Sequence, residues 1–160
     1  MITRMFFVSS FLVMCGCSAV QEITPFSGEK PSSVCIVKHD AVKEAVLKTI
    51  ETEYQANGVS TVVVDGIYEL KHGLWQPRWY PDQVQTCDAL NFYVANWGWD
   101  LAAYMKFANI WVTDLAGSEK IAQGTYDATR VAGPSKFISA EEKIKELVSK
   151  MLNPVDQKTQ

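Results

Sequence analysis

The stretch VCIVKHDAVKEAVLKTIETEYQANGVSTVVV, residues 34–64, decides the fold class of this chain. Short runs at 34–37 and 59–64 are rich in β-branched residues, which favour strands. The segment between them carries core-type side chains at helical spacing, with charged residues mostly on the other faces. These core-type positions are Val42, Val46, Thr49, Ile50 and Tyr54. The sequence therefore predicts a β-α-β unit.

Local signals mark the two ends of this helix. Asp40 stands where an N-cap residue belongs, because its carboxylate can accept from the first free backbone amides. Asn57-Gly58 supplies a left-handed stop at the C-terminal end. If the two flanking strands are parallel neighbours, the connection between them should be right-handed.

The middle of the chain reads as antiparallel sheet. Residues 89–97 and 102–113 are aromatic and apolar runs, and we interpret Trp97-Gly98-Trp99-Asp100 as the turn between them. Residues 115–118 form the next predicted turn, and 119–129 then alternate as a further strand.

Strict alternation along 104–112 predicts the two faces of that strand. One face holds Met105, Phe107, Asn109 and Trp111. The other holds Tyr104, Lys106, Ala108, Ile110 and Val112. Only one face is apolar enough to need full burial under helices.

A second helix closes the domain. Ser139-Ala140-Glu141-Glu142 has the pattern of a capping box. An apolar stripe follows, and Pro154 ends the helix. The stripe consists of Ile144, Leu147, Val148 and Met151. The order β-α-β-β-β-β-α predicts one α+β domain over 33–153, with a mixed sheet and two helices packed on one face, followed by a polar tail at 154–160.

The N-terminus has the pattern of an export signal. Arg4 precedes a short apolar block, and the block is shorter than the roughly 20 residues that span a bilayer. The block ends Met14-Cys15-Gly16-Cys17-Ser18, which resembles the lipobox of bacterial lipoproteins, although Met14 stands where that pattern usually has Leu. The resemblance implies that residues 1–16 are a removed signal peptide and that Cys17 carries the lipid. The alternative is an ordinary cleaved signal with two incidental cysteines.

The same resemblance implies a cellular location. Ser18, where an Asp would favour retention, predicts sorting to the periplasmic face of the outer membrane. A diacylglycerol plus an amide-linked acyl chain such as palmitate would hold the protein there, since each buried methylene adds about 0.8 kcal/mol. Residues 17–32 are rich in Pro, Ser and Gly and are predicted to be a flexible tether.

Cys35 and Cys87 are the cysteines left after the signal region. An even pair in an oxidising compartment predicts one disulfide. A reactive or metal-binding pair is the alternative, but the chain has no Cys-x-x-Cys spacing.

Composition and motifs argue against several functions. The net charge is -3 with no basic run, which excludes nucleic acid as an expected partner. Only His39 and His72 are available, without zinc-site spacing, and we predict no metal and no cofactor. His39-Asp40 beside Cys35 can be read as a base with a nucleophile, or as a helix cap beside a paired cysteine. No catalytic motif is present, so we expect a non-enzymatic protein and keep an envelope hydrolase as the remote alternative.

The segment 70–82 is the most unusual part of the chain. We predict a long loop that presents Trp75, Arg78, Trp79 and Tyr80, residue types that dominate binding hot spots. In the alternative reading, the two tryptophans fold back onto a small core near Cys87. The Trp97-Gly98-Trp99 turn has the same two readings.

The element order and the lipobox together resemble a group of small envelope lipoproteins. Their domain is similar to the amino-terminal domain of the TolB translocation protein and to the lipoprotein activator of a penicillin-binding protein. The resemblance implies a membrane-anchored accessory factor that binds envelope proteins, and it transfers no functional residue. A periplasmic binder of a small apolar or glycan ligand is the second hypothesis, and the oligomeric state stays open.

Overall fold

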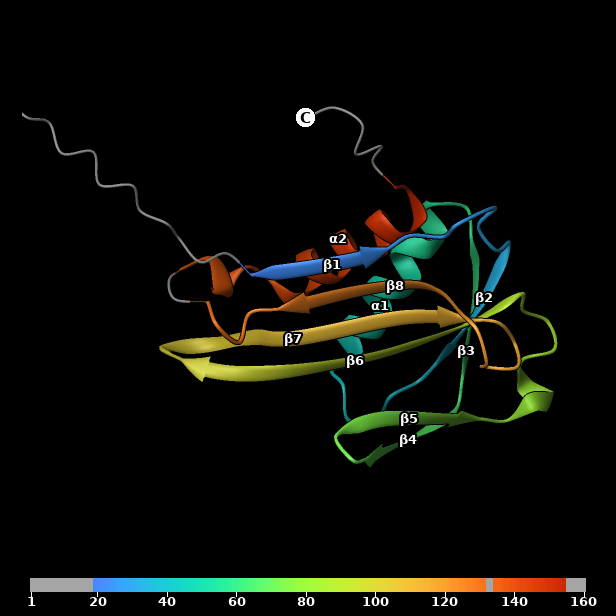
Figure 1. The fold of residues 1–160 in the computed structure, drawn as a ribbon, viewed down its shortest axis with the longest axis horizontal. Coiled ribbons are helices and arrows are strands. Elements are labelled where there is room, and N and C mark those ends of the chain that lie inside the picture. Colours follow the sequence, from blue (N-terminus) through green and yellow to red (C-terminus); the bar gives the residue numbers. More distant parts are fainter. Residues whose placement is uncertain (1–18, 132–133, 155–160) are drawn as a thin grey trace, which may run out of the picture.

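The computed structural model describes residues 19–131 and 134–154. The predicted signal peptide, Cys17 and most of the polar tail lie outside these residues. The described chain forms a six-stranded sheet with two helices on one face and a separate two-stranded sheet on the other (Figure 1). The fold is therefore α+β, as predicted.

The large sheet has the strand order β1-β8-β7-β6-β2-β3. Strand β2 is parallel to both β3 and β6, whereas the remaining pairs are antiparallel, which makes the sheet mixed. Its strands are β1 (Val20–Thr24), β2 (Ser33–Val37), β3 (Ser60–Val64), β6 (Ala89–Asp100), β7 (Ala102–Thr113) and β8 (Lys120–Asp127). The predicted β-α-β unit is confirmed, because α1 (Glu44–Ala56) connects the parallel pair β2 and β3.

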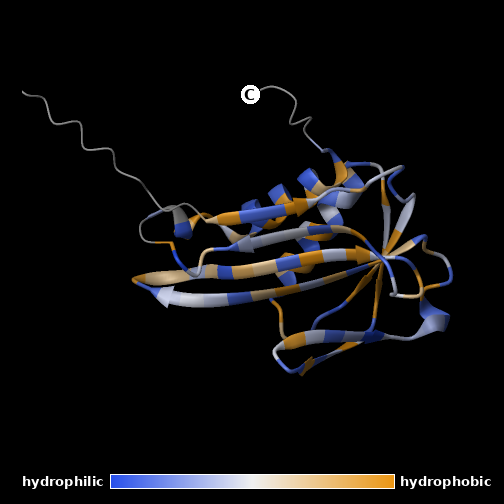
Figure 2. Cartoon of the chain, viewed as in Figure 1, coloured by the Kyte–Doolittle hydropathy of each residue, from blue (hydrophilic) through white to orange (hydrophobic). Residues whose placement is uncertain are grey.

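Helices α1 and α2 (Ala140–Leu152) cover one face of this sheet, and the main core lies between them and the strands. Figure 2 shows apolar and polar residues interleaved along the strands and helices, as one buried face requires. Ile36, Tyr93 and Ile110 come from the sheet side of this core, and Ile50 and Leu147 from the helices. Ser139 caps α2 by accepting from the backbone N–H of Glu142 at 3.0 Å, as predicted.

The start of α1 differs from the prediction. The helix begins at Glu44, and Lys43 occupies the N-cap position without a side-chain cap. Asp40 instead pairs with Lys38 at 3.0 Å, within a turn that precedes the helix. The C-terminal stop is confirmed, since Asn57 is the C-cap and Gly58 has a φ of 77°.

Strand β1 lies inside the segment that we predicted to be a flexible tether. Val20–Thr24 pair with β8 in antiparallel register, from Val20 opposite Asp127 to Thr24 opposite Gln123. Ile23 packs against the main core, and Gln21 bonds with two side chains of α2. The prediction of a tether is therefore wrong for these five residues.

The segment 70–82 is also different from the predicted loop. Most of it belongs to a hairpin of β4 (Gly66–Lys71) and β5 (Leu74–Trp79), with a 3-10 turn at Pro81–Gln83. His72 and Gly73 form the tight turn, with φ of 51° and 78°. Positive φ at both central residues is the geometry that suits a two-residue hairpin.

The predicted turn at Trp97-Gly98-Trp99-Asp100 is strand. Strand β6 continues to Asp100, and the chain reverses at Leu101, which has a φ of 60°. A bulge also interrupts β7, because Asn96 faces Phe107 and the next residue, Trp97, faces Met105. The extra residue, Lys106, moves Met105 from its predicted face into the helix-side core.

Candidate functional site: an aromatic groove beneath the hairpin

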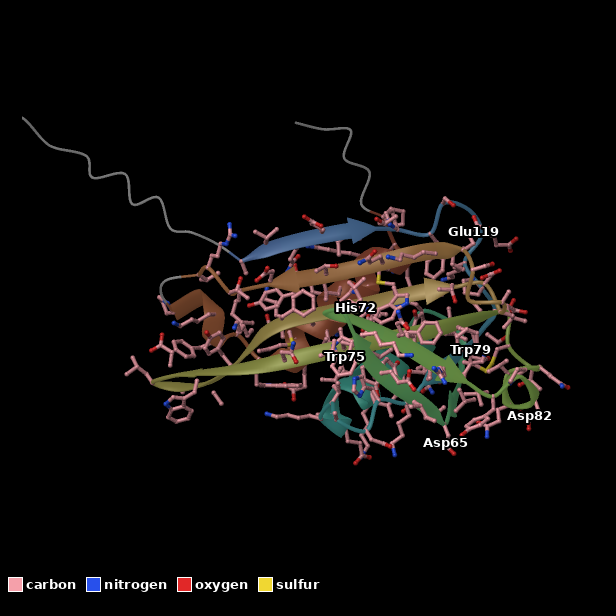
Figure 3. All side chains as sticks on the ribbon, turned by 60° about the horizontal axis from the view of Figure 1, so that its bottom comes forward. Asp65, His72, Trp75, Trp79, Asp82 and Glu119 are labelled. Atoms are coloured by element: carbon pink, nitrogen blue, oxygen red, sulfur yellow. A yellow bond between two sulfur atoms is a disulfide. The ribbon has the colours of Figure 1, made fainter. Side chains whose placement is uncertain are left out.

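The β4–β5 hairpin lies against the sheet face opposite the helices, and a groove separates it from strands β6 and β7. We call this feature the hairpin groove. Figure 3 shows the hairpin in front of the sheet, with Trp75 and Trp79 along it. The groove has a volume of about 550 Å³. Its lining residues are Gly73, Leu74, Trp75, Gln76, Pro77, Trp79, Phe92, Val94, Phe107, Asn109, Trp111, Thr113, Gly117 and Lys120.

Three aromatic rings in contact line the hairpin groove. The ring centroids of Trp79 and Phe92 are 5.3 Å apart, and those of Phe92 and Trp111 are 5.5 Å apart. These distances are typical of favourable aromatic pairs. Trp79 and Trp111 both pack against a second core cluster that contains Cys35 and Cys87. For Trp79, the reading in which the ring folds back near Cys87 is therefore correct.

A buried histidine supports the other end of the hairpin. His39 is 5% exposed, and its ring stacks on Tyr68 at 4.0 Å and meets the edge of Trp75 at 5.0 Å. Burial lowers the pKa of His39, against a smaller opposing effect of Asp40. The Tyr68 hydroxyl donates to the carbonyl of Val37 at 2.9 Å. His39 is thus a buried packing residue that links the hairpin to the sheet.

Uncharged polar side chains lie beside the rings on the sheet. Asn109 lines the groove, and its Oδ1 accepts from Gln123 Nε2 at 2.9 Å and from Thr125 Oγ1 at 3.1 Å. Lys120 Nζ donates to Gln123 Oε1 at 2.7 Å. These two bonds engage the oxygen of Asn109, so its amide nitrogen is the group left to donate. The groove thus combines apolar rings with hydrogen-bonding groups, of which Lys120 is charged and the others are neutral.

The structure divides the predicted binding surface into two sides. Trp75 and Trp79 are half-buried toward the groove, whereas Arg78 and Tyr80 are exposed. Arg78 pairs with Glu69 across the hairpin at 2.9 Å. The prediction therefore found two groove residues and two residues of the outer side.

The two tryptophans of the Trp97-Gly98-Trp99 segment lie in different environments. Trp97 packs against the main core, and Lys43 Nζ lies 4.6 Å from its ring centroid. Trp99 is 77% exposed. Trp97 is thus structural, whereas Trp99 belongs to the surface.

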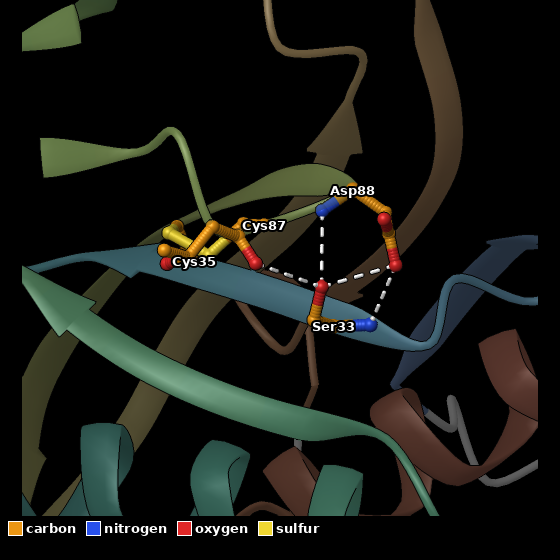
Figure 4. Close-up of a disulfide and its surroundings, with 5 residues drawn as sticks. Ser33, Cys35, Cys87 and Asp88 are labelled. Atoms are coloured by element: carbon orange, nitrogen blue, oxygen red, sulfur yellow. Dashed lines mark hydrogen bonds between the residues drawn. A yellow bond between two sulfur atoms is a disulfide. The ribbon is translucent and has the colours of Figure 1, made fainter. Parts of the chain in front are cut away.

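Cys35 and Cys87 form the predicted disulfide, which crosslinks β2 to the segment before β6. Figure 4 shows Ser33 and Asp88 beside it. The backbone N–H and the Oγ of Ser33 donate to Asp88 Oδ2 at 2.9 and 3.0 Å. A Cys35 nucleophile is therefore excluded while the bond is intact.

Within 19–131 and 134–154, no group of three or more His, Cys, Asp and Glu side chains is placed to hold a metal ion. Among the helices of the same residues, none is both long enough and apolar enough to cross a membrane.

Sequence reasoning missed the sheet side of the groove. Phe92, Asn109 and Gly117 come from β6, β7 and the turn after β7, and nothing in their local pattern sets them apart. A signal for the hairpin was present, because His72-Gly73 separates two runs of similar length.

The fold belongs to the class of α+β proteins in which a mixed sheet carries two helices on one face. No protein-family model and no curated protein sequence matches the chain. Among solved structures it is similar to PelC from Paraburkholderia phytofirmans, described as a dodecamer, with a TM-score of 0.54 and 7% identity over 83% of this chain and 94% of PelC. A single-substitution variant of PelC, also a dodecamer, has a TM-score of 0.52 and 8% identity over 83% and 93%. Such low identity shows likeness of fold alone, and the resemblance to TolB-type domains stays a prediction.

Proposed function

We propose that this protein is a non-enzymatic accessory lipoprotein of the cell envelope and is held at the membrane through Cys17. Its hairpin groove binds a segment of a partner protein. The observation that carries the binding role is the groove itself. It combines Trp75, Trp79 and Trp111 with polar groups of which Lys120 alone is charged, the composition of binding sites rather than of acid–base catalysis.

The anchor rests on the lipobox around Cys17. Because β1 begins at Val20, the sheet begins three positions after Cys17 (20 - 17 = 3). An extended chain of that length spans about 10 Å, so the domain would work close to the membrane surface. The outer membrane, periplasmic side, is the proposed location on the basis of Ser18.

Metabolic labelling tests the anchor. Cells that express the full chain are grown with a radiolabelled fatty acid, and the wild type is compared with Cys17→Ser. We expect label in the wild type and none in the variant. Labelling that persists in Cys17→Ser, or is absent from both, would remove Cys17 as the anchor.

Site-specific crosslinking tests the groove. A photoreactive phenylalanine analogue replaces Gln76, an exposed groove residue, or Thr52, an exposed residue of α1, as the matched control. We expect a discrete adduct from position 76 in living cells, none from position 52, and a weaker adduct when Trp75→Ala is added. Equal adducts at both positions would contradict a binding role for the groove.

A neutral glycan is the second candidate ligand, and the Asn109, Gln123 and Thr125 cluster beside Trp111 favours it. Neutral sugars need an apolar platform and uncharged donors and acceptors, and both are present. N-acetylglucosamine oligomers would serve as the probe in a tryptophan fluorescence titration. A saturable change that is lost in Asn109→Leu would support a glycan, and unchanged emission would remove this candidate.

We also propose that copies of this protein associate with one another. PelC is described as a dodecamer in both neighbouring structures. In this chain β1 and β3 are the two edges of the large sheet, and Val62 and Val63 of β3 are exposed large apolar residues. We propose that copies associate through these edges. Native mass spectrometry of the detergent-solubilised protein should find oligomers, and a monomer at all concentrations would contradict them.

A further inference from the structure

The hairpin that joins β6 and β7 projects beyond the rest of the sheet (Figure 1). The two strands pair with each other as far as Asp100 opposite Ala102. On the neighbouring side, β8 stops pairing with β7 at Asp127 opposite Phe107. The last part of the β6–β7 hairpin therefore stands free of β8. We call residues 99–103 the hairpin tip.

The hairpin tip is apolar and exposed. Trp99 is 77% exposed and Leu101 is 92% exposed, and Ala102 and Ala103 are exposed beside them. Leu101 also has a φ of 60°, a left-handed conformation that is unfavourable for a non-glycine residue. A glycine or asparagine would suit that turn better, so the leucine side chain has no explanation in the folding of the tip.

The base of the tip is held in place. Lys136 is buried and forms an ion pair with Asp100, while its Nζ lies 5.2 Å from the ring centroid of Tyr104. Lys43 covers the ring of Trp97 on the same hairpin. These contacts lie just below the tip, so Trp99 and Leu101 are presented on a supported element.

The chain enters the sheet from the end at which the tip lies. Val20 pairs with Asp127, and Asp127 pairs with Phe107, so the start of β1 is level with Phe107. Phe107 pairs with Asn96, and Leu101 lies five residues further along β6 and its turn (101 - 96 = 5), which corresponds to about 17 Å. Cys17 precedes Val20 by three residues, which reach about 10 Å in an extended chain. The tip would therefore extend about 7 Å beyond an acylated Cys17.

We propose that Trp99 and Leu101 insert into the interfacial region of the bilayer that holds Cys17, so that the domain has two contacts with the membrane and a defined orientation. The inference rests on the proposed lipid anchor. Apolar groups of interfacial anchors enter to about 5–10 Å, which matches the expected reach of the tip. Tryptophan is enriched at this depth because its ring is apolar and its N–H is polar.

The test places a fluorescent label at either end of β7. The full-length lipidated protein, carrying bimane on Leu101→Cys or on the control Leu115→Cys, is reconstituted into vesicles of phosphatidylcholine with brominated acyl chains. Leu115 is also exposed, and it follows the opposite end of β7. We expect severalfold stronger quenching at position 101 than at position 115.

A second measurement needs no added cysteine. Brominated lipid should quench part of the tryptophan emission of the unlabelled protein, and Trp99→Phe should lose that quenchable part. Equal quenching at positions 101 and 115, or unchanged quenching in Trp99→Phe, overturns the tip contact while the anchor stands. Failure of the unlabelled protein to float with the vesicles overturns the anchor and the tip contact together.

Discussion

Gly117 is the glycine at which we expect the most costly substitution. Its φ is 70°, and a Cβ at this position would overlap the Trp79 ring beneath the hairpin. Gly117→Ala combines backbone strain with overpacking, and we expect it to lower the free energy of unfolding by about 2–4 kcal/mol. Urea unfolding followed by circular dichroism measures the change.

Gly73 provides the matched control. Its φ is 78°, but a Cβ there would meet no atom within 4 Å. Gly73→Ala should therefore cost only the backbone strain, about 1–2 kcal/mol. Equal costs at the two glycines would show that Trp79 does not pack against Gly117 as described.

His39 should make stability depend on pH in the weakly acidic range. Burial lowers its pKa in the folded state, so the unfolded chain binds the proton more readily. The contribution of His39 to the free energy of unfolding is fully present above the pKa of about 6.5 that it has in the unfolded chain. It is lost as the pH falls through the lower pKa of the folded state. We expect His39→Gln to lose less stability than the wild type between pH 7.5 and pH 5. Parallel curves for the two proteins would contradict this role.

Strand β1 depends on polar contacts with α2. Glu146 Oε2 accepts from Gln21 Nε2 at 3.0 Å and from Lys143 at 2.9 Å, and its Oε1 accepts from Lys150 at 2.7 Å. Partial burial opposes ionisation, but these hydrogen bonds outweigh it and lower the pKa of Glu146 to about 2. The network therefore stabilises the fold above about pH 4.5 and loses that effect as the pH falls toward 2.

Glu146→Gln tests this network. Because the carboxylate is partly exposed, we expect a loss of only about 1 kcal/mol at pH 7, shrinking as the pH approaches 2. Chemical denaturation at several pH values measures it, and hydrogen exchange should show faster opening of β1. Glu44→Gln is the control, since its pair with Lys48 is exposed on α1 and should contribute little. A loss in Glu44→Gln as large as in Glu146→Gln would contradict the special role of the network.

The elements that sequence analysis missed share a physical cause. Strand β5 contains Pro77, which ordinarily argues against a strand. It is tolerated here because a two-stranded sheet leaves one side of each strand unpaired. Strand β1 has the sequence VQEIT, in which Gln21 bonds with α2 whereas Glu22 and Thr24 are exposed. Both misses reflect partners that lie far away in the sequence.

The disulfide should matter for the molecule as a whole. Cys35 and Cys87 are separated by 52 positions, and both are buried in the second core cluster beneath the hairpin. The chain-entropy model gives a bond of this span a contribution of about 4 kcal/mol. We expect Cys35→Ala/Cys87→Ala to lower the thermal midpoint by more than 10 °C in calorimetry. Equal midpoints of the double variant and the wild type would contradict a structural role.

Local patterns were enough to determine much of this protein. The β-α-β unit, the closing helix with its Ser139 cap and the pairing of Cys35 with Cys87 were all predicted correctly. Each depends on periodicity, on capping chemistry within one turn, or on the presence of only two cysteines after the predicted signal peptide and Cys17. Such signals can be read from a short stretch of sequence or from the number of cysteines, without knowledge of the tertiary structure.

Tertiary structure alone decided the hairpin groove, the place of β1 and the hairpin tip. A single extra residue in β7, Lys106, changes which face Met105 occupies, and its carbonyl accepts from the Ala128 N–H at 2.9 Å. The groove exists because β5 comes to lie over Phe92 and Trp111 from other strands. The register of strand pairing and the packing of the hairpin are determined by contacts between residues far apart in the sequence. Local sequence patterns carry no information about these contacts.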